Sequence, residues 1–207
     1  MSVPDKSIDP RLLNAAKKVF LKKGFEMASL AEICQTAGVT TGALYKRYRG
    51  KEELFAEVVS KTIREMKEFV SSLEEANLSS LTDQELYDGF FMRVENNIHW
   101  LRFLYERKEE LYLLIKCASG TRYTNFHHDW SEITASLIYK YYLEIKKRGL
   151  TSVEISPEEM HVLASAVWTL YYEPLIHGFS WEQMEHHAET MHHFIDWHKV
   201  FSIRKPD

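Results

Sequence analysis

The sequence predicts an all-α protein, with a small N-terminal domain of three short helices and a larger C-terminal helical domain. Apolar residues recur at spacings of three and four along nearly the whole chain, and the alternating pattern of a β-strand is almost absent. Only 8 glycines and 5 prolines occur among 207 residues, and most of them stand where one apolar stripe ends and the next begins. We place the domain boundary so that the two domains cover residues 1–50 and 51–207.

The first helix is predicted to begin at Asp9 and to end at Gly24. Asp9 is a favourable N-cap, and Pro10 suits the first helical position because its φ is already helical. One apolar stripe faces the core and consists of Leu12, Leu13, Ala16, Val19 and Phe20. Glycine at position 24 can adopt the left-handed conformation that often ends a helix.

Two shorter helices follow, and a glycine turn separates them. Ser29 begins a capping box, SLAE, which opens a helix over residues 30–36. Gly38 ends this helix, and Thr40 caps the next one, which is predicted to run to Tyr48. Helices of roughly eight residues are not stable alone, so these must pack on their neighbours.

The larger domain is predicted to contain six further helices. They lie near residues 51–74, 83–106, 109–119, 126–148, 157–177 and 181–202. No linker separates the two domains, so we expect the helix over 51–74 to run from one into the other.

The composition favours a cytoplasmic protein without a membrane segment. The longest apolar run, over residues 162–172, has 11 residues, whereas a membrane-spanning helix needs roughly 20. The N-terminus lacks the basic and then apolar layout of a signal peptide. The chain has 2 cysteines, too few for a disulfide framework, and Cys34 lies on an apolar helix face where we expect it in the core.

Charge is distributed unevenly along the chain. Residues 1–58 contain ten Lys and Arg against seven Asp and Glu, for a net charge of +3, and the remainder carries −7. A basic head on an acidic body suits binding of a polyanion by the head. An unevenly charged, solvated surface explains the composition equally well.

The two short helices and their turn, Ala37-Gly38-Val39, meet the requirements of a helix-turn-helix, whose second helix enters the major groove of DNA. The exposed face of the second helix would present hydroxyls, small residues, a phenol and two cations. These residues are Thr40, Thr41, Gly42, Ala43, Tyr45, Lys46 and Arg47. Lys51 adds a cation beside the backbone amides that begin the next helix, and such amides can hold a phosphate.

The string from Ser29 to Leu54, SLAEICQTAGVTTGALYKRYRGKEEL, resembles the DNA-binding signature of the TetR family of bacterial transcription regulators. The resemblance covers about residues 8–58, and beyond them only the length and the helical content agree. It implies an N-terminal three-helix helix-turn-helix DNA-binding domain. It further implies a larger C-terminal helical domain for ligand binding and dimerisation.

The resemblance also implies roles for single residues. Thr41, Gly42 and Tyr45 would lie nearest the base edges. Phosphates would be held by Thr40, the Ala43 amide, Arg47, Lys51 and the start of the first motif helix at Ser29 and Leu30. Arg47 stands where histidine is frequent in the family, Tyr48 where phenylalanine is frequent, and Gly50 where serine or asparagine usually caps the next helix. Tyr45 could instead be a structural tyrosine, Arg47 and Lys51 could be solvated charges, and Tyr48 is expected in the core.

Aromatic residues concentrate after residue 58, where 22 of the 27 occur, including all five tryptophans. Two helical stripes could line an apolar cavity for a flat or greasy effector. They consist of Met92, Trp100, Phe103 and Tyr112, and of Trp168, Tyr171 and Tyr172. For any one of these residues, plain hydrophobic core is the commoner outcome. The resemblance implies a small-molecule effector in this domain without identifying it.

The last two predicted helices carry large apolar side chains, and in TetR-like proteins the corresponding helices form a two-fold four-helix interface. The residues are Val162, Leu163, Val167, Leu170, Leu175, Ile176, Met184, Met191, Phe194, Ile195 and Phe201. We therefore expect a homodimer through these helices. Two recognition helices about 34–36 Å apart can read a palindromic operator in double-stranded DNA, whereas one reads too few bases.

Ten histidines raise the question of a metal site. Five of them, at positions 186, 187, 192, 193 and 198, are spaced by 1, 5, 6 and 7, and none by the 3 or 4 that place two ligands on one helix face. We expect no metal and no cofactor, and we assign these histidines to an exposed or interfacial helix. Their protonation near pH 6 could tune that interface.

The leading hypothesis is a repressor that leaves its operator when an effector binds and shifts the helix over 51–74. One alternative is a helical small-molecule-binding protein whose head no longer reads DNA. The other is a metal-dependent helical enzyme. The sequence contains no glycine-rich phosphate loop, nucleophile elbow, HExxH motif or cysteine-rich cluster, which argues against an enzyme.

Overall fold

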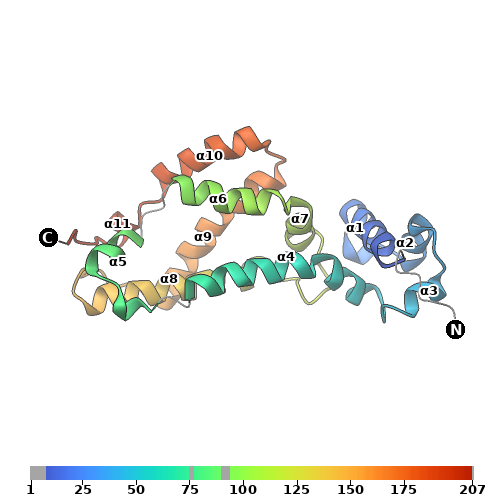
Figure 1. Cartoon of the computed structure of the whole chain (residues 1–207), viewed down its shortest axis with the longest axis horizontal. Helices are drawn as coiled ribbons and strands as arrows, with labels where there is room; N and C mark the ends of the chain where they lie inside the picture. Colours follow the sequence, from blue (N-terminus) through green and yellow to red (C-terminus); the bar gives the residue numbers. More distant parts are fainter. Residues whose placement is uncertain (1–7, 75–76, 90–93, 207) are drawn as a thin grey trace. The chain divides into compact units, whose positions relative to one another are not determined.

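The computed structural model describes residues 8–74, 77–89 and 94–206, and all regular secondary structure within these ranges is helical (Figure 1). The elements are α1 (Ile8–Met27), α2 (Leu30–Ala37), α3 (Thr41–Tyr45), α4 (Lys51–Glu74), the 3-10 helix η1 (Leu78–Ser80), α5 (Asp83–Gly89), α6 (Val94–Tyr105), α7 (Lys108–Lys116), α8 (Phe126–Lys147), α9 (Pro157–Ile176), α10 (Trp181–Phe194) and α11 (Trp197–Val200). The all-α prediction is confirmed. Met92, one of the predicted pocket residues, lies outside the described residues. None of the described helices is long and apolar enough to cross a membrane.

Most predicted helix bounds agree with the structure, and α4 begins and ends where the sequence indicates. The predicted helix over 181–202 is wrong, because it ends at Phe194 and a separate helix, α11, follows. The Asp196 side chain accepts a hydrogen bond from the backbone amide of Lys199 at 3.1 Å and so caps α11 as a new helix.

The described chain divides into two compact units that do not follow the order of the sequence. Residues up to Met66 and residues 107–126 form the first unit, and residues 67–106 and those from His127 onward form the second. Helix α4 therefore supplies residues to both units, and α7 belongs to the first. The predicted functional boundary between residues 50 and 51 stays a prediction.

An aromatic cluster forms the core of the first unit. The rings of Phe20 and Phe25 on α1 lie 5.1 and 5.6 Å from the ring of Phe55 on α4, both edge to face. All three side chains are buried, as are Ile33 of α2 and Leu44 of α3. The short helices thus gain their stability from burial of apolar surface against α1 and α4 rather than from their own hydrogen bonds.

Polar contacts attach α7 to this unit. The Lys17 ammonium on α1 lies 2.5 Å from a Glu109 carboxylate oxygen and 2.8 Å from one of Glu110. Burial alone would lower the pKa of Lys17, but the two carboxylates outweigh it and raise that pKa. At the same end of α7, the N-cap residue Arg107 donates to Glu65 of α4 at 2.7 Å. The segment over 107–126 is thus part of the head, although it lies far from the head in the sequence.

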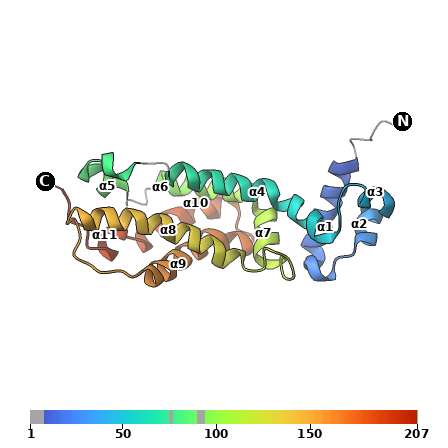
Figure 2. The same ribbon diagram turned by 90° about the horizontal axis from the view of Figure 1, so that it is seen from below.

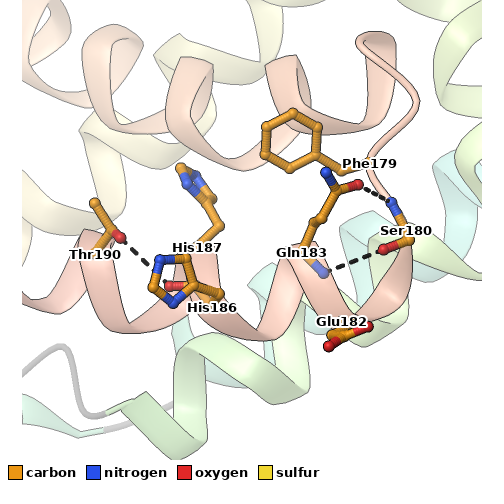
Figure 3. Close-up of a pocket in the computed structure, with 7 residues that line it drawn as sticks. All are labelled: Phe179, Ser180, Glu182, Gln183, His186, His187 and Thr190. Carbon is orange, nitrogen blue, oxygen red and sulfur yellow. Dashed lines mark hydrogen bonds between the residues drawn. The ribbon is translucent and has the colours of Figure 1, made fainter.

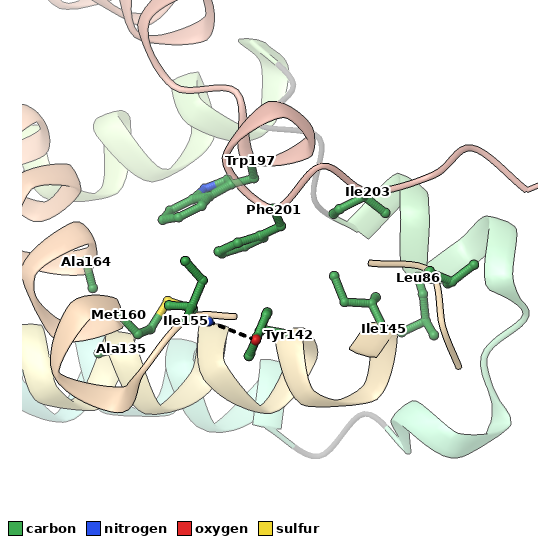
Figure 4. Close-up of a cluster of buried hydrophobic side chains, with 11 residues drawn as sticks. Leu86, Ala135, Tyr142, Ile145, Ile155, Met160, Ala164, Trp197, Phe201 and Ile203 are labelled. Carbon is green, nitrogen blue, oxygen red and sulfur yellow. Dashed lines mark hydrogen bonds between the residues drawn. The ribbon is translucent and has the colours of Figure 1, made fainter. Parts of the chain in front are cut away.

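The core of the second unit lies where α5, α8, α9 and α11 meet (Figures 2 and 4). Its largest fully buried side chain is that of Tyr142 on α8, which packs against Phe201 with ring centroids 5.5 Å apart. The Tyr142 hydroxyl donates to the Val153 carbonyl at 2.9 Å and accepts from the Ile155 amide at 3.0 Å. One buried hydroxyl therefore fixes the connection between α8 and α9.

Replacing Tyr142 with phenylalanine is expected to lower the free energy of unfolding by about 1–3 kcal/mol, because two buried backbone groups lose their partner. Urea denaturation followed by circular dichroism measures this change. Tyr139, whose ring lies 5.4 Å from that of Tyr142 on the same helix, supplies the control variant Tyr139→Phe. A loss as large in Tyr139→Phe as in Tyr142→Phe would contradict the assignment.

Candidate nucleic-acid interface

The turn between α2 and α3 adopts the predicted geometry. The Ser29 hydroxyl accepts a hydrogen bond from the Glu32 amide at 3.2 Å and caps α2. Gly38 has φ 64° and ψ 39°, and its amide bonds back to the Cys34 and Gln35 carbonyls, which ends α2 in the left-handed conformation. The predicted capping box is only half formed, because the Glu32 carboxylate binds the Lys23 ammonium at 2.6 Å instead of reaching back to the cap.

Helix α3 is shorter than predicted and ends at Tyr45 rather than at Tyr48. The Arg47 amide bonds to the Leu44 carbonyl at 2.8 Å, three residues back, so the chain tightens into a turn. The Thr40 hydroxyl accepts from the Ala43 amide at 3.2 Å and caps the start of the helix. Helix α3 therefore consists of only about one and a half turns, and the Thr40 side chain caps its start.

Burial of Leu44 fixes which face of α3 points outward. Its side chain is completely buried, and the structure leaves the predicted contact residues Thr40, Thr41, Gly42, Tyr45 and Lys46 exposed. Tyr45 is 59% exposed, which is far more than a structural tyrosine requires. Tyr48, which we expect in the core, is only half-buried, and burial is the main cause that raises its pKa.

The Arg47 guanidinium has partners within the protein, so it is not a solvated charge. Its Nε lies 2.5 Å from an Asp9 carboxylate oxygen, and its Nη1 donates to the Ala43 carbonyl at 3.2 Å. The prediction of Asp9 as an N-cap is wrong, because α1 begins one residue earlier at Ile8 and Asp9 lies in its first turn. From that position the carboxylate reaches the arginine.

Lys51 also has partners within the protein. Its ammonium donates to the backbone carbonyls of Glu26 and Ala28, both at 3.0 Å, and lies 4.4 Å from the centre of the Phe25 ring. These contacts join the start of α4 to the connection between α1 and α2. A phosphate contact by Lys51 stays a prediction.

The end of α1 differs from the prediction at Gly24. Its φ of 73° is positive as expected, but its ψ of 168° is extended, and helical structure resumes up to Met27. The Phe25 amide bonds to the Cys117 carbonyl at 2.9 Å, beyond α7, instead of bonding within α1. Gly24 thus kinks the helix toward a partner that is distant in sequence. Cys34 and Cys117 are both buried free thiols, and burial raises the pKa of each.

The predicted pocket residues fall into separate groups. Trp100 and Phe103 stack at 4.9 Å on α6, and Trp168 and Tyr172 on α9 lie 5.4 Å apart. Tyr112 belongs to the first unit and is exposed at 36%. Between these two residues on α9, Tyr171 donates to the Asn97 side chain at 2.8 Å, and burial raises the pKa of Tyr171. Their common role in an effector pocket stays a prediction.

An open groove of about 630 Å³ lies along α10 (Figure 3). It is lined by Phe179, Ser180, Glu182, Gln183, His186, His187 and Thr190. His187 points toward α9, where its Nε2 lies 2.8 Å from the Leu170 carbonyl oxygen. Sequence reasoning missed the groove, because its lining is mostly polar, although Gln183, His187 and Thr190 do recur at helical spacing.

Several apolar residues that we assign to a dimer interface belong instead to the core of the second unit. Met184, Met191 and Phe201 are completely or almost completely buried within the chain itself, so they cannot form an exposed face. Val162 on α9 and Phe194 on α10 remain exposed, at 65% and 76%. Among the residues that the structure describes, no three His, Cys, Asp or Glu side chains are grouped so that they could hold a metal ion.

Comparisons with known proteins match the N-terminal segment to one protein family. Residues 12–58 match the family described as "Bacterial regulatory proteins, tetR family". The chain is 31% identical over 86 residues to the HTH-type transcriptional repressor AcnR of Corynebacterium jeikeium, which is 41% of this chain and 46% of AcnR. It is 37% identical over 49 residues to the HTH-type transcriptional regulator UidR of Escherichia coli K12, which is 24% of this chain and 25% of UidR. The chain thus spans less than half the length of these curated relatives.

The similarity in fold covers more of the chain than the similarity in sequence does. A crystal structure of a transcriptional regulator (TerR/AcrR family) from Aquifex aeolicus VF5 superimposes with a TM-score of 0.61 over 91% of this chain and 99% of that chain. The identity is 18%, so this likeness establishes the fold alone. Residues 12–58 therefore match the TetR family in sequence, and the fold of the chain is similar to that of this solved regulator.

Proposed function

We propose that the chain is a TetR-type transcription regulator, a homodimeric repressor that a small-molecule effector releases from a palindromic operator. The observation that carries the proposal is the exposed face of α3, within the segment that matches the family. The buried Leu44 side chain anchors one face of α3 in the first unit, while Thr41, Gly42 and Tyr45 face outward. A short helix with its N-terminal residues exposed is the part of a helix-turn-helix that contacts base edges.

The side chains around α3 suit two kinds of DNA contact, one with base edges and one with phosphates. Hydroxyls and a phenol can exchange hydrogen bonds with base edges, and Gly42 has open space around its Cα that lets the backbone approach closely. Lys46 is exposed beside them and can contact a phosphate. The Lys51 ammonium, bonded to neutral carbonyls, keeps its full positive charge near the start of α4.

A homodimer through α9 and α10 explains the apolar surface that the chain leaves uncovered. Val162 and Phe194 are large apolar side chains with most of their surface exposed. Covering them in a second copy would remove apolar area from water and bring two recognition helices into one assembly. The groove along α10 offers a concave surface on one of the same two helices.

Effector control would act through an element shared by the two units. Helix α4 is continuous from Lys51 to Glu74 and supplies residues to both of them. An effector that binds the second unit can change operator affinity only if it binds the two states with different affinity. The aromatic side chains of α6 and α9 supply the apolar surface that such a ligand needs.

Selection of bound fragments from random DNA tests the proposal and is expected to yield a palindrome. Thr41→Ala should then relax one position in each half-site, at a cost of about 1–3 kcal/mol, because one base edge loses its partner. Lys46→Ala should weaken binding to all sequences alike and reduce the salt dependence by about one unit for each head.

Fluorescence anisotropy with the selected duplex measures both effects. Lys67→Ala makes the same change in charge outside residues 12–58 and serves as the control, with an expected salt dependence equal to that of the unmodified protein. A recovered set of fragments without common sequence, or a specificity unchanged by Thr41→Ala, would rule out base reading by α3.

Val162→Asp and Phe194→Asp are each expected to shift the protein toward monomer, because an interface would bury an unpaired carboxylate. Sedimentation velocity at micromolar protein concentration measures the change. Leu143→Asp, at a side chain on α8 that is 45% exposed, is the control and should leave the assembly unchanged. A dimer that survives both α9 and α10 substitutions would place the interface elsewhere.

A further inference from the structure

An ion pair connects the first turn of α1 with the turn that follows α3. Arg47 Nε lies 2.5 Å from an Asp9 oxygen, and the same guanidinium donates to the Ala43 carbonyl at 3.2 Å. Both residues belong to the first compact unit. The contact therefore lies within one compact unit, beside the face that we assign to DNA.

The arginine is the more enclosed partner of this pair. Its side chain is 19% exposed, compared with 48% for Asp9. Among the described residues, Arg47 alone of the three cations assigned to DNA, the others being Lys46 and Lys51, is paired with a carboxylate. Its positive charge is therefore offset at close range by a carboxylate, whereas Lys46 is exposed to solvent.

A DNA phosphate would have to compete with this carboxylate. Carboxylates and phosphates bind guanidinium groups in the same geometry, and Asp9 is already in place before DNA arrives. Sequence-independent DNA binding depends almost entirely on the number of cations that are available for phosphates. If the Asp9 carboxylate occupies Arg47, the first unit will bind random DNA less tightly than its number of basic residues indicates.

We propose that Asp9 restrains sequence-independent DNA binding by occupying the Arg47 guanidinium. The inference rests on the DNA-binding function proposed above. It assigns to Asp9 a positioning role: the carboxylate touches no base or phosphate and acts through Arg47. Neither Asp9 nor Arg47 belongs to the proposed base-reading face formed by Thr41, Gly42 and Tyr45.

The test is the affinity of Asp9→Asn for a duplex of random sequence. Asparagine keeps the size of the side chain but cannot neutralise the arginine, so each head gains one available cation. We expect the variant to bind random duplex about tenfold more tightly at 50 mM salt. Two additional phosphate contacts in each dimer should make that advantage shrink about tenfold between 50 and 200 mM salt.

Three further variants separate this effect from a general change of charge. In the Asp9→Asn background, Arg47→Ala should abolish the whole gain, as a double-mutant cycle requires for a coupled pair. Asp9→Glu keeps the carboxylate and should bind random duplex like the unmodified protein. Glu57→Gln removes a negative charge from an exposed position on α4 and should change the affinity by less than about twofold.

Arg47→Ala in the unmodified chain gives a second readout that needs no change at Asp9. Because the guanidinium is already occupied, this variant is expected to keep its affinity for random duplex within about twofold. Thermal unfolding followed by circular dichroism checks that each variant is folded.

The outcomes distinguish the inference from the function on which it rests. If the unmodified protein ignores duplex DNA at 50 mM salt, the proposed DNA-binding function fails. If it binds, but Asp9→Asn behaves like Glu57→Gln, the inference is overturned. A gain that persists without Arg47, or a large loss on Arg47→Ala alone, also overturns it.

Discussion

Helix α3, the proposed recognition helix, contains only five residues, and a helix of that length is not stable in water by itself. Its position depends on one buried side chain, Leu44, and on caps at both of its ends. The left-handed Gly38 brings the chain out of α2 so that Thr40 can cap α3. The position of α3 therefore depends on packing within the first unit, where α2 contacts both α1 and α3 and the phenylalanines of α1 and α4 form an aromatic core.

The head of the molecule extends beyond the segment that matches the family. Lys17 binds two carboxylates of α7, and the amide after Gly24 bonds to the carbonyl of Cys117. These contacts use side chains and backbone groups that α1 cannot satisfy within itself. As a result, a segment some 90 residues further along the chain takes part in holding α1 in place.

Local signals made the helix-turn-helix predictable from the sequence. Ser29, Gly38 and Thr40 each act on residues within four positions, and the structure forms the cap or turn that each of them predicts. The pairing of Asp9 with Arg47 and the carbonyl contacts of Lys51 were not predictable, because they join residues 23 to 38 positions apart. The burial of Met184 and Met191 within the chain was not predictable either, since a large apolar side chain suits a protein's own core as well as an interface. The break after Phe194 could have been found, because Asp196 is a favourable N-cap.

The distribution of tryptophan gives the two units different optical properties. All five indoles belong to the second unit, where Trp130 and Trp168 are buried with ring centroids 5.8 Å apart. Intrinsic emission excited at the red edge of protein absorption therefore originates from the second unit, while the first unit, which has no tryptophan, contributes none. A change in that emission when duplex is added would be a direct, label-free report that an event at the first unit reaches the second.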